Sequence, residues 1–140
     1  MRKRLFLLAV FAVLFPAIAN AESFQYWLGH CSANAPAARD ASQKPLEATV
    51  DGNTIHFVQT LNTYCSTASE NFSLSHKIIG NVIQITETFD AKTVAQCTCP
   101  ISISGIISDL KSGGYRVRFY FDNKYTEKKD LIGQFNAVIK

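Results

Sequence analysis

The sequence predicts an all-β fold, a β-sandwich of about seven strands. Three observations predict it. Apolar and polar residues alternate through most of the chain after residue 46, turn residues separate the alternating segments, and no segment sustains the period of a helix. Short strands divided by regular turns are typical of antiparallel sandwiches. We therefore expect residues 22–140 to form a single β-sandwich domain.

The first 21 residues have the regions of a secretory signal peptide. Basic residues open the chain, residues 5–15 are apolar, and Ala19-Asn20-Ala21 has the small-residue pattern of a cleavage site. The apolar stretch is shorter than the ~20 residues that span a bilayer. We expect a mature chain that begins at Glu22, is periplasmic or extracellular, and keeps no membrane anchor after processing.

Removal of this segment changes the charge of the protein. The whole chain has 14 basic and 11 acidic side chains, and Arg2, Lys3 and Arg4 leave with the signal peptide, so the mature chain has 11 of each and no net charge. Nucleic-acid binding rests on cationic surface against phosphate. We therefore expect no nucleic-acid partner.

The N-terminal part of the mature chain combines a strand with a loop. Residues 22–28 are predicted as the first strand and contain the densest aromatic cluster, Phe24, Tyr26 and Trp27. Residues 32–45 are rich in Ala, Ser and Pro and show no apolar period, which predicts a long mobile loop.

Three strands are predicted in the middle of the chain, over residues 54–62, 72–79 and 82–89. The last two are expected to form a hairpin. Gly80-Asn81 between two alternating segments is typical of a type I′ or II′ turn, which needs a positive φ angle.

Three further strands are predicted over residues 99–107, 115–121 and 131–139, with the charged segment 122–130 as a loop. Each strand alternates, so that side chains at odd-numbered positions should face the core. These are Cys97, Cys99, Ile101, Ile103, Ile107, Tyr115, Val117, Phe119, Phe121, Leu131, Phe135, Ala137 and Ile139.

Four cysteines lie in the mature chain, and an even number in an exported domain favours disulfides. A Cys97–Cys99 bond would close a strained ring, so we expect each of these two to pair with Cys31 or Cys65. Both connectivities of that kind stay open. The alternatives are a four-cysteine zinc site and a redox-active Cys-x-Cys. A zinc site usually has two paired-cysteine knuckles, whereas this sequence has one.

Leu110, a Gly-containing turn and Tyr115 at the start of an alternating strand resemble immunoglobulin-like and fibronectin type III domains. The resemblance implies an antiparallel immunoglobulin-like sandwich, which in this chain would be cross-linked by disulfides. It also implies a tyrosine corner, with the Tyr115 hydroxyl bonded to backbone near Leu110. The buried tryptophan of that family is missing. The Cys97-Thr98-Cys99-Pro100 segment, followed by the turn from Leu110 to Tyr115, also resembles small exported bacterial sandwich proteins of unassigned function.

Motifs of catalysis are absent: there is no G-x-S-x-G, H-E-x-x-H or glycine-rich phosphate loop. His76 should pair with Ile85 in the hairpin, which places Glu87 diagonal to it as a candidate acid–base or metal pair. His30 beside Cys31 is a second candidate pair of metal ligands. Such pairs are more often structural polar contacts. We expect no enzyme, no cofactor and no metal site.

The exposed side chains favour a binding protein. Arg116, Arg118 and Tyr120 should form a row on the outer face of one strand, and these residue types are enriched in interface hot spots. Tyr26 and Trp27 either cap the sandwich or face a ligand. We expect an exported non-enzymatic binding module with a protein or glycan partner, as a monomer or weak homodimer. The alternatives are an exported hydrolase inhibitor, and a small metal-binding protein or hydrolase.

Overall fold

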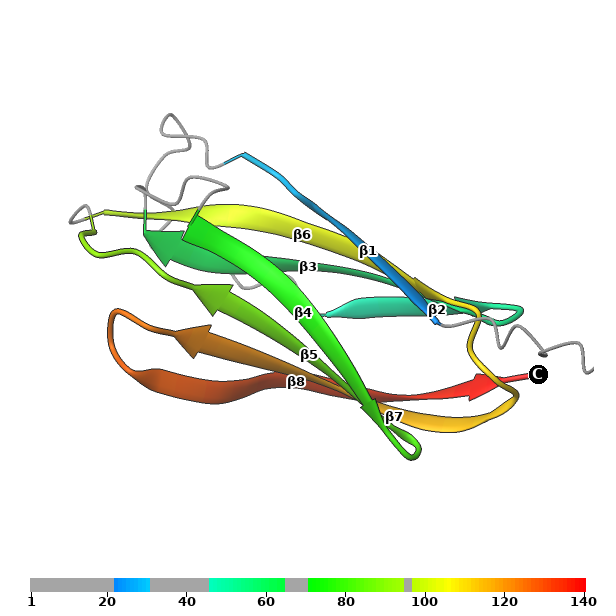
Figure 1. Cartoon of the computed structure of the whole chain (residues 1–140). Helices are drawn as coiled ribbons and strands as arrows, with labels where there is room; N and C mark the ends of the chain where they lie inside the picture. Colours follow the sequence, from blue (N-terminus) through cyan, green and yellow to red (C-terminus); the bar gives the residue numbers. More distant parts are fainter. Residues whose placement is uncertain (1–21, 31–45, 65–70, 95–96) are drawn as a thin grey trace, which may run out of the picture.

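The computed structural model describes residues 22–30, 46–64, 71–94 and 97–140, and this part of the chain is all-β, as the sequence predicts. Two layers of strands run roughly along the same axis (Figure 1). No helix in the described ranges is long and apolar enough to cross a membrane. The strands are β1 (Ser23–Leu28), β2 (Glu47–Asp51), β3 (Thr54–Tyr64), β4 (Phe72–Ile79), β5 (Val82–Phe89), β6 (Thr98–Ser108), β7 (Gly113–Asn123) and β8 (Lys128–Ile139).

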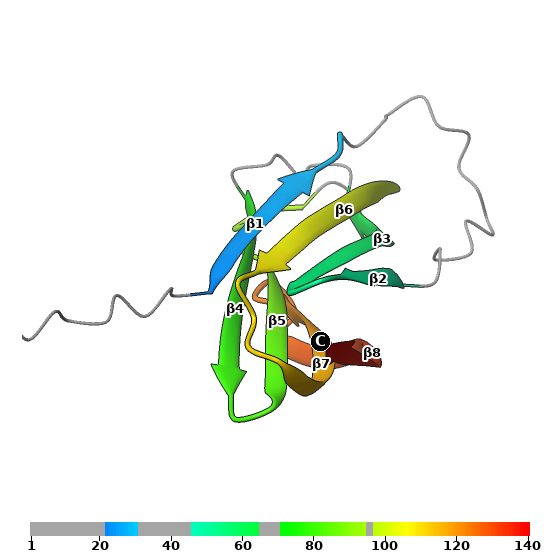
Figure 2. The same ribbon diagram turned by 90° about the vertical axis from the view of Figure 1, so that its right-hand side faces the viewer.

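Each layer is a four-stranded sheet. One sheet has the order β1-β6-β3-β2 and the other the order β4-β5-β7-β8. The end view shows the two sheets packed face to face (Figure 2). Each sheet therefore has one face toward the core and one face away from it.

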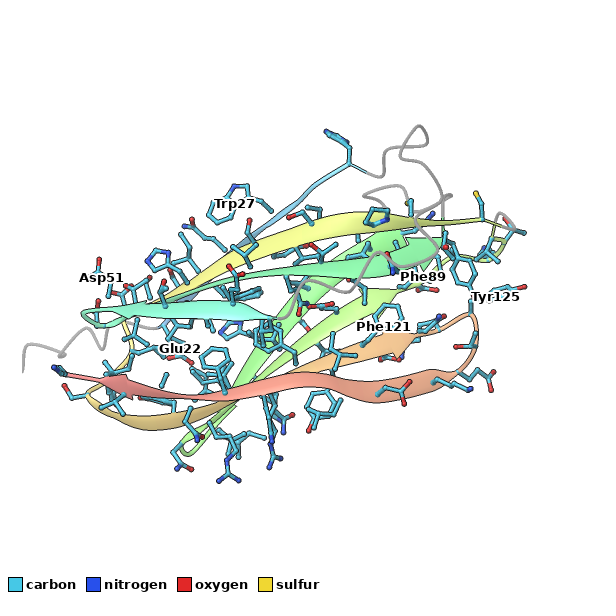
Figure 3. The ribbon with its side chains drawn as sticks, turned by 180° about the vertical axis from the view of Figure 1, so that it is seen from behind. Glu22, Trp27, Asp51, Phe89, Phe121 and Tyr125 are labelled. Atoms are coloured by element: carbon cyan, nitrogen blue, oxygen red, sulfur yellow. The ribbon has the colours of Figure 1, made fainter. Side chains whose placement is uncertain are left out.

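The core follows from the alternation of apolar residues along the strands. Phe57 of β3 and Phe119 of β7 meet between the layers with ring centroids 5.0 Å apart. Phe89 and Phe121 also lie between the layers, whereas Trp27 points away from them (Figure 3). The apolar side chains with no exposed surface are Ile55, Ile83, Ile85, Phe89, Ile103, Ile107, Val117 and Phe119.

The hairpin of β4 and β5 has the predicted register, with Ile79 opposite Val82 and His76 opposite Ile85. Gly80 has a φ angle of 59° and its neighbour Asn81 is not at positive φ, as a type II′ turn requires. The prediction of this hairpin is confirmed.

The described part of the chain contains eight strands rather than the expected seven. The additional strand is β2, which precedes the turn at Gly52-Asn53 and pairs antiparallel with β3 over five residues. It is short, lies at the edge of its sheet and is largely exposed, so its apolar pattern is weak.

The prediction of an antiparallel immunoglobulin-like arrangement is wrong in two respects. β5 and β7 are parallel neighbours. After β5 the chain crosses to the other layer as β6 and returns as β7, so that β7 runs in the direction of β5. In addition, β1 lies beside β6, whereas the first two strands of an immunoglobulin domain are neighbours.

The segment 122–130 is not a loop throughout. β7 and β8 continue into it, and only residues 124–127 form the turn. A bulge between Phe119 and Tyr120 shifts the register, so that Gly133 lies opposite Phe119 and Leu131 opposite Tyr120. Leu131 is consequently half-exposed, contrary to the inward position that parity predicts.

The predicted inward position of Cys97 and Cys99 is correct for only one of the two. Cys99 is buried, but Cys97 precedes β6 and is exposed, since the strand geometry begins at Thr98. Neither is a free thiol. Cys31 and Cys65 lie outside the described residues, so the pairing stays a prediction. The signal peptide (1–21) and the loop 32–45 also lie outside them.

The hydrogen bond expected for Tyr115 is present. Its hydroxyl donates to the backbone carbonyl of Lys111 at 3.0 Å, directly after the buried Leu110. The contact is exposed to solvent, which lowers its contribution to stability compared with a buried one. Tyr115 itself is half-buried and packs against the core.

Candidate binding face

The basic residues of the strands lie in one sheet and not in the other. Strands β1, β2, β3 and β6 contain no Lys or Arg, and their charged residues are Glu47 and Asp51. Within the eight described strands, all Lys and Arg residues belong to the β4-β5-β7-β8 sheet. They are Lys77, Arg116, Arg118, Lys128 and Lys129.

Strand register places four of these side chains on the outward side of the sheet, which we call the basic face. Arg116 and Arg118 alternate with the buried Val117 and Phe119, so they point outward. Lys77 of β4 and Lys129 of β8 lie at positions that share their side of the sheet. The basic face is therefore defined by Lys77, Arg116, Arg118 and Lys129.

One row of side chains crosses the whole basic face. Lys77 lies opposite Gln84, Gln84 lies beside Arg118, and Arg118 lies opposite Gln134. Three intervals between neighbouring strands make this row roughly 14 Å long. It alternates cations with amides, and amides both donate and accept hydrogen bonds.

Arg118 is the central cation of this row. The side chain is half-buried, and its Nε is shielded from water and has no hydrogen-bond partner in the described part of the chain. A shielded donor without a partner carries a desolvation cost. A ligand that supplies an acceptor there would remove that cost.

Asp122 lies outward on β7 two rows away from this one, and its carboxylate is already paired. The Asp122 carboxylate accepts from Lys124 Nζ at 2.8 Å. This hydrogen bond and the charge of Asp122 raise the pKa of Lys124. Lys129 Nζ lies 5.4 Å from the centre of the Tyr120 ring, which adds a cation–π contact. The basic face therefore keeps an excess of positive charge.

Tyr26 and Trp27, the other predicted binding residues, belong to β1 in the other sheet. Trp27 is 51% exposed on the outward side of the other sheet, in a row with Ser104 and Val58. Tyr26 points inward and packs against the core with Phe24. The structure therefore brings Arg116, Arg118 and Tyr120 together, and it places Trp27 on the opposite face.

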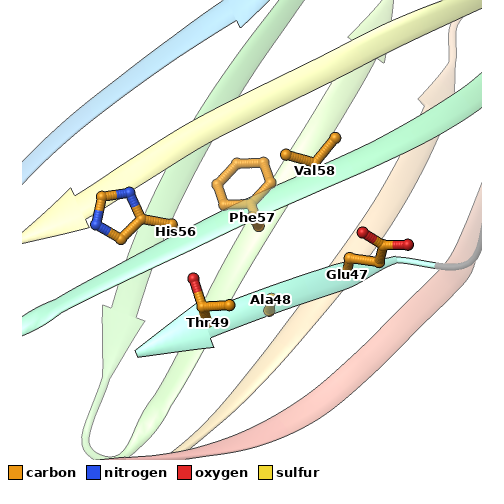
Figure 4. Close-up of a pocket in the computed structure, with 6 residues that line it drawn as sticks. All are labelled: Glu47, Ala48, Thr49, His56, Phe57 and Val58. Atoms are coloured by element: carbon orange, nitrogen blue, oxygen red, sulfur yellow. The ribbon is translucent and has the colours of Figure 1, made fainter. Parts of the chain in front are cut away.

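A shallow hollow lies on the Trp27 side, between β2 and β3. It has a volume of about 150 Å³ and is open to solvent, and Figure 4 shows its lining. The lining residues are Glu47, Ala48, Thr49, His56, Phe57 and Val58. His56, one of the lining residues, is half-buried.

Glu87 is the most unusual side chain of the core. It is fully buried, and neither carboxylate oxygen has a hydrogen-bond partner among the described residues. Burial raises its pKa from 4.5 to about 8. Glu87 is therefore protonated and neutral at pH 7. Gln59 is also buried, and its Nε2 lacks a partner in the same part of the chain.

The candidate pair of His76 and Glu87 does not form. The register places them diagonally as predicted, but the His76 ring packs on Phe24, with centroids 4.7 Å apart, and the Glu87 carboxyl group has no hydrogen-bond partner among the described residues. In the described ranges, no group of three or more His, Cys, Asp or Glu side chains is arranged to hold a metal ion. His30 is exposed, and its neighbour Cys31 lies outside those ranges.

Comparison of the chain with models of known protein families, with curated proteins and with solved structures gave no match.

Proposed function

We propose that this protein is an exported binding module that uses the basic face to hold an anionic partner. One observation carries the proposal. The row of Lys77, Gln84, Arg118 and Gln134 spans four strands, which belong to two hairpins that are separate in the sequence. Arg118 within it has a shielded donor that no described residue satisfies.

The surrounding structure supports this use of the face. Below Arg116 and Arg118, the sheet is anchored by Val117 and Phe119, both without exposed surface. Strands of a packed sheet hold their side chains more firmly than loops do, so less freedom is lost when a ligand binds. The mature chain is neutral overall, so the attraction is local to one face.

Export and disulfides belong to the same proposal. A signal peptide at residues 1–21 would deliver the chain to an oxidising compartment, where Cys31, Cys65, Cys97 and Cys99 would staple the sandwich. The scaffold that presents the basic face is a sandwich of two four-stranded sheets.

Charge-matched variants test the proposal. The mature protein is passed over immobilised anionic polymers at low and at raised salt. The first variant carries Lys77→Gln, Arg116→Gln and Arg118→Gln. The second loses the same charge outside the basic face, through Lys92→Gln, Lys111→Gln and Lys140→Gln.

We expect the wild-type protein and the second variant to be retained at low salt and released as salt screens the charges. The first variant should pass through. Equal retention of the two variants would contradict the proposal, because net charge rather than the basic face would then explain binding.

A further inference from the structure

We infer that the anionic partner of the basic face is an acidic polysaccharide, a linear glycan with carboxylate or sulfate groups. This inference rests on the proposed function and narrows it. It follows from the kinds of side chain that lie between the cations, from the shape of the face, and from the chemistry of Arg118.

The centre of the basic face is polar. The outward residues of β5 between the turn and Phe89 include Gln84, Thr86 and Thr88, each half-buried. On β8, the exposed Gln134 and Asn136 flank Arg118 and Arg116. Amides and hydroxyls beside cations offer hydrogen bonds to both the hydroxyl and the acidic groups of a glycan.

Apolar side chains lie at the margins of this face. Ile79 belongs to the edge strand β4, and Leu131 and Val138 to the edge strand β8. The inner strands also carry two outward side chains of other kinds, Val82 of β5 and Tyr120 of β7. The remaining outward side chains between the cations are amides and hydroxyls, and this predominance of hydrogen-bonding groups favours a hydroxyl-rich ligand.

Sheet geometry favours an extended chain. The row from Lys77 to Gln134 is roughly 14 Å long because it crosses four strands. The hollow at β2 and β3 lies on the other sheet. A row of this length can contact several successive units of a linear polymer.

The Arg118 guanidinium is suited to bind an acidic group of that polymer. A guanidinium presents a planar fork of donors, which matches a carboxylate or sulfate with two parallel hydrogen bonds. Lysine at the same position keeps the charge and loses the fork. Arg118→Lys should therefore bind more weakly than the wild type and more tightly than Arg118→Gln.

The test is a solution titration of the mature protein with defined polymers. The acidic glycans are polygalacturonate, which carries carboxylates, and dextran sulfate, which carries sulfate esters. Unmodified dextran is the neutral control. Polyglutamate and double-stranded DNA represent acidic protein and nucleic acid. The Lys92→Gln, Lys111→Gln double variant is the charge-matched control for Lys77→Gln, Arg118→Gln.

We expect one or both acidic glycans to bind, dextran to remain unbound, and polyglutamate and DNA to bind at least tenfold more weakly. Arg118→Gln should weaken glycan binding by about tenfold to a hundredfold, the effect of one or two charge-assisted hydrogen bonds. The exposed Lys77→Gln should weaken it about tenfold without disturbing the fold.

Two other results have distinct meanings. Binding of polyglutamate or DNA as tight as that of the glycans, with the same dependence on Arg118, would overturn the polysaccharide inference and leave the proposed function standing. Failure of every anionic polymer to bind would overturn both.

Discussion

The buried Glu87 makes folding stability depend on pH in a direction opposite to that of most carboxylates. Its pKa is about 8 in the folded protein, and its ordinary value is 4.5. Between these values the folded state holds a proton that the unfolded state releases. The stabilisation is fully present below pH 4.5 and is lost as pH rises toward 8.

The size of the effect follows from the pKa difference. Each pH unit in this window lowers the free energy of unfolding by about 1.4 kcal/mol. At pH 7 the carboxyl group of Glu87 therefore costs about 3 kcal/mol. This is a large share of the roughly 5–15 kcal/mol that holds a typical domain together.

Glu87→Gln isolates this cost, because the amide has nearly the same shape and does not ionise. We expect the variant to be about 3 kcal/mol more stable than the wild type at pH 7, with the difference vanishing near pH 4.5. Urea unfolding at several pH values between 4.5 and 8 measures it. Glu47→Gln, at an exposed position, is the matched control and should change stability by less than about 0.5 kcal/mol.

Parallel stability curves for the wild type and Glu87→Gln across this pH range would refute the reasoning. Such curves would mean that Glu87 titrates alike in the folded and unfolded states. Its burial without a polar partner would then not govern its ionisation.

Three further predictions concern stability and processing. Tyr115→Phe removes the hydrogen bond to Lys111 and should lower the free energy of unfolding by about 0.5–1.5 kcal/mol; an unchanged melting curve would contradict this. Gly105→Ala should cost about 1–3 kcal/mol in chemical unfolding, because the added methyl group would overlap the Phe57 ring, and a neutral result would show that the ring moves freely. Intact mass of the exported protein should show a chain that begins at Glu22 with all cysteines in disulfides, and a retained Met1 or a titratable thiol would contradict it.

Alternation along the chain was enough to predict most strands and the hairpin at Gly80, because side-chain parity and turn residues are local signals. Features that depend on residues far apart in the sequence could not be predicted in this way. The parallel pairing of β5 and β7 depends on the path of β6 through the other layer. The inward prediction for Leu131 failed because the bulge at Phe119 and Tyr120 changes parity without a sequence signal.

The candidate site was predictable in part for the same reason. Arg116, Arg118 and Tyr120 share one face of one strand, which parity alone reveals. The hairpin register also places Lys77 opposite Gln84. That these residues adjoin Arg118 follows only from the order of strands in the sheet. The burial of Glu87 follows from parity, but the lack of a hydrogen-bond partner for it among the described residues depends on the three-dimensional packing.

The central claim is that the basic face, rather than the Trp27 side, is the binding surface. Amide NMR of the mature protein during titration with polygalacturonate tests it most directly. We predict that the largest shifts occur in β5 and β7 around Gln84 and Arg118, with little change near Trp27 and Val58. Shifts concentrated at Trp27 and Val58, with Gln84 and Arg118 unchanged, would contradict the account.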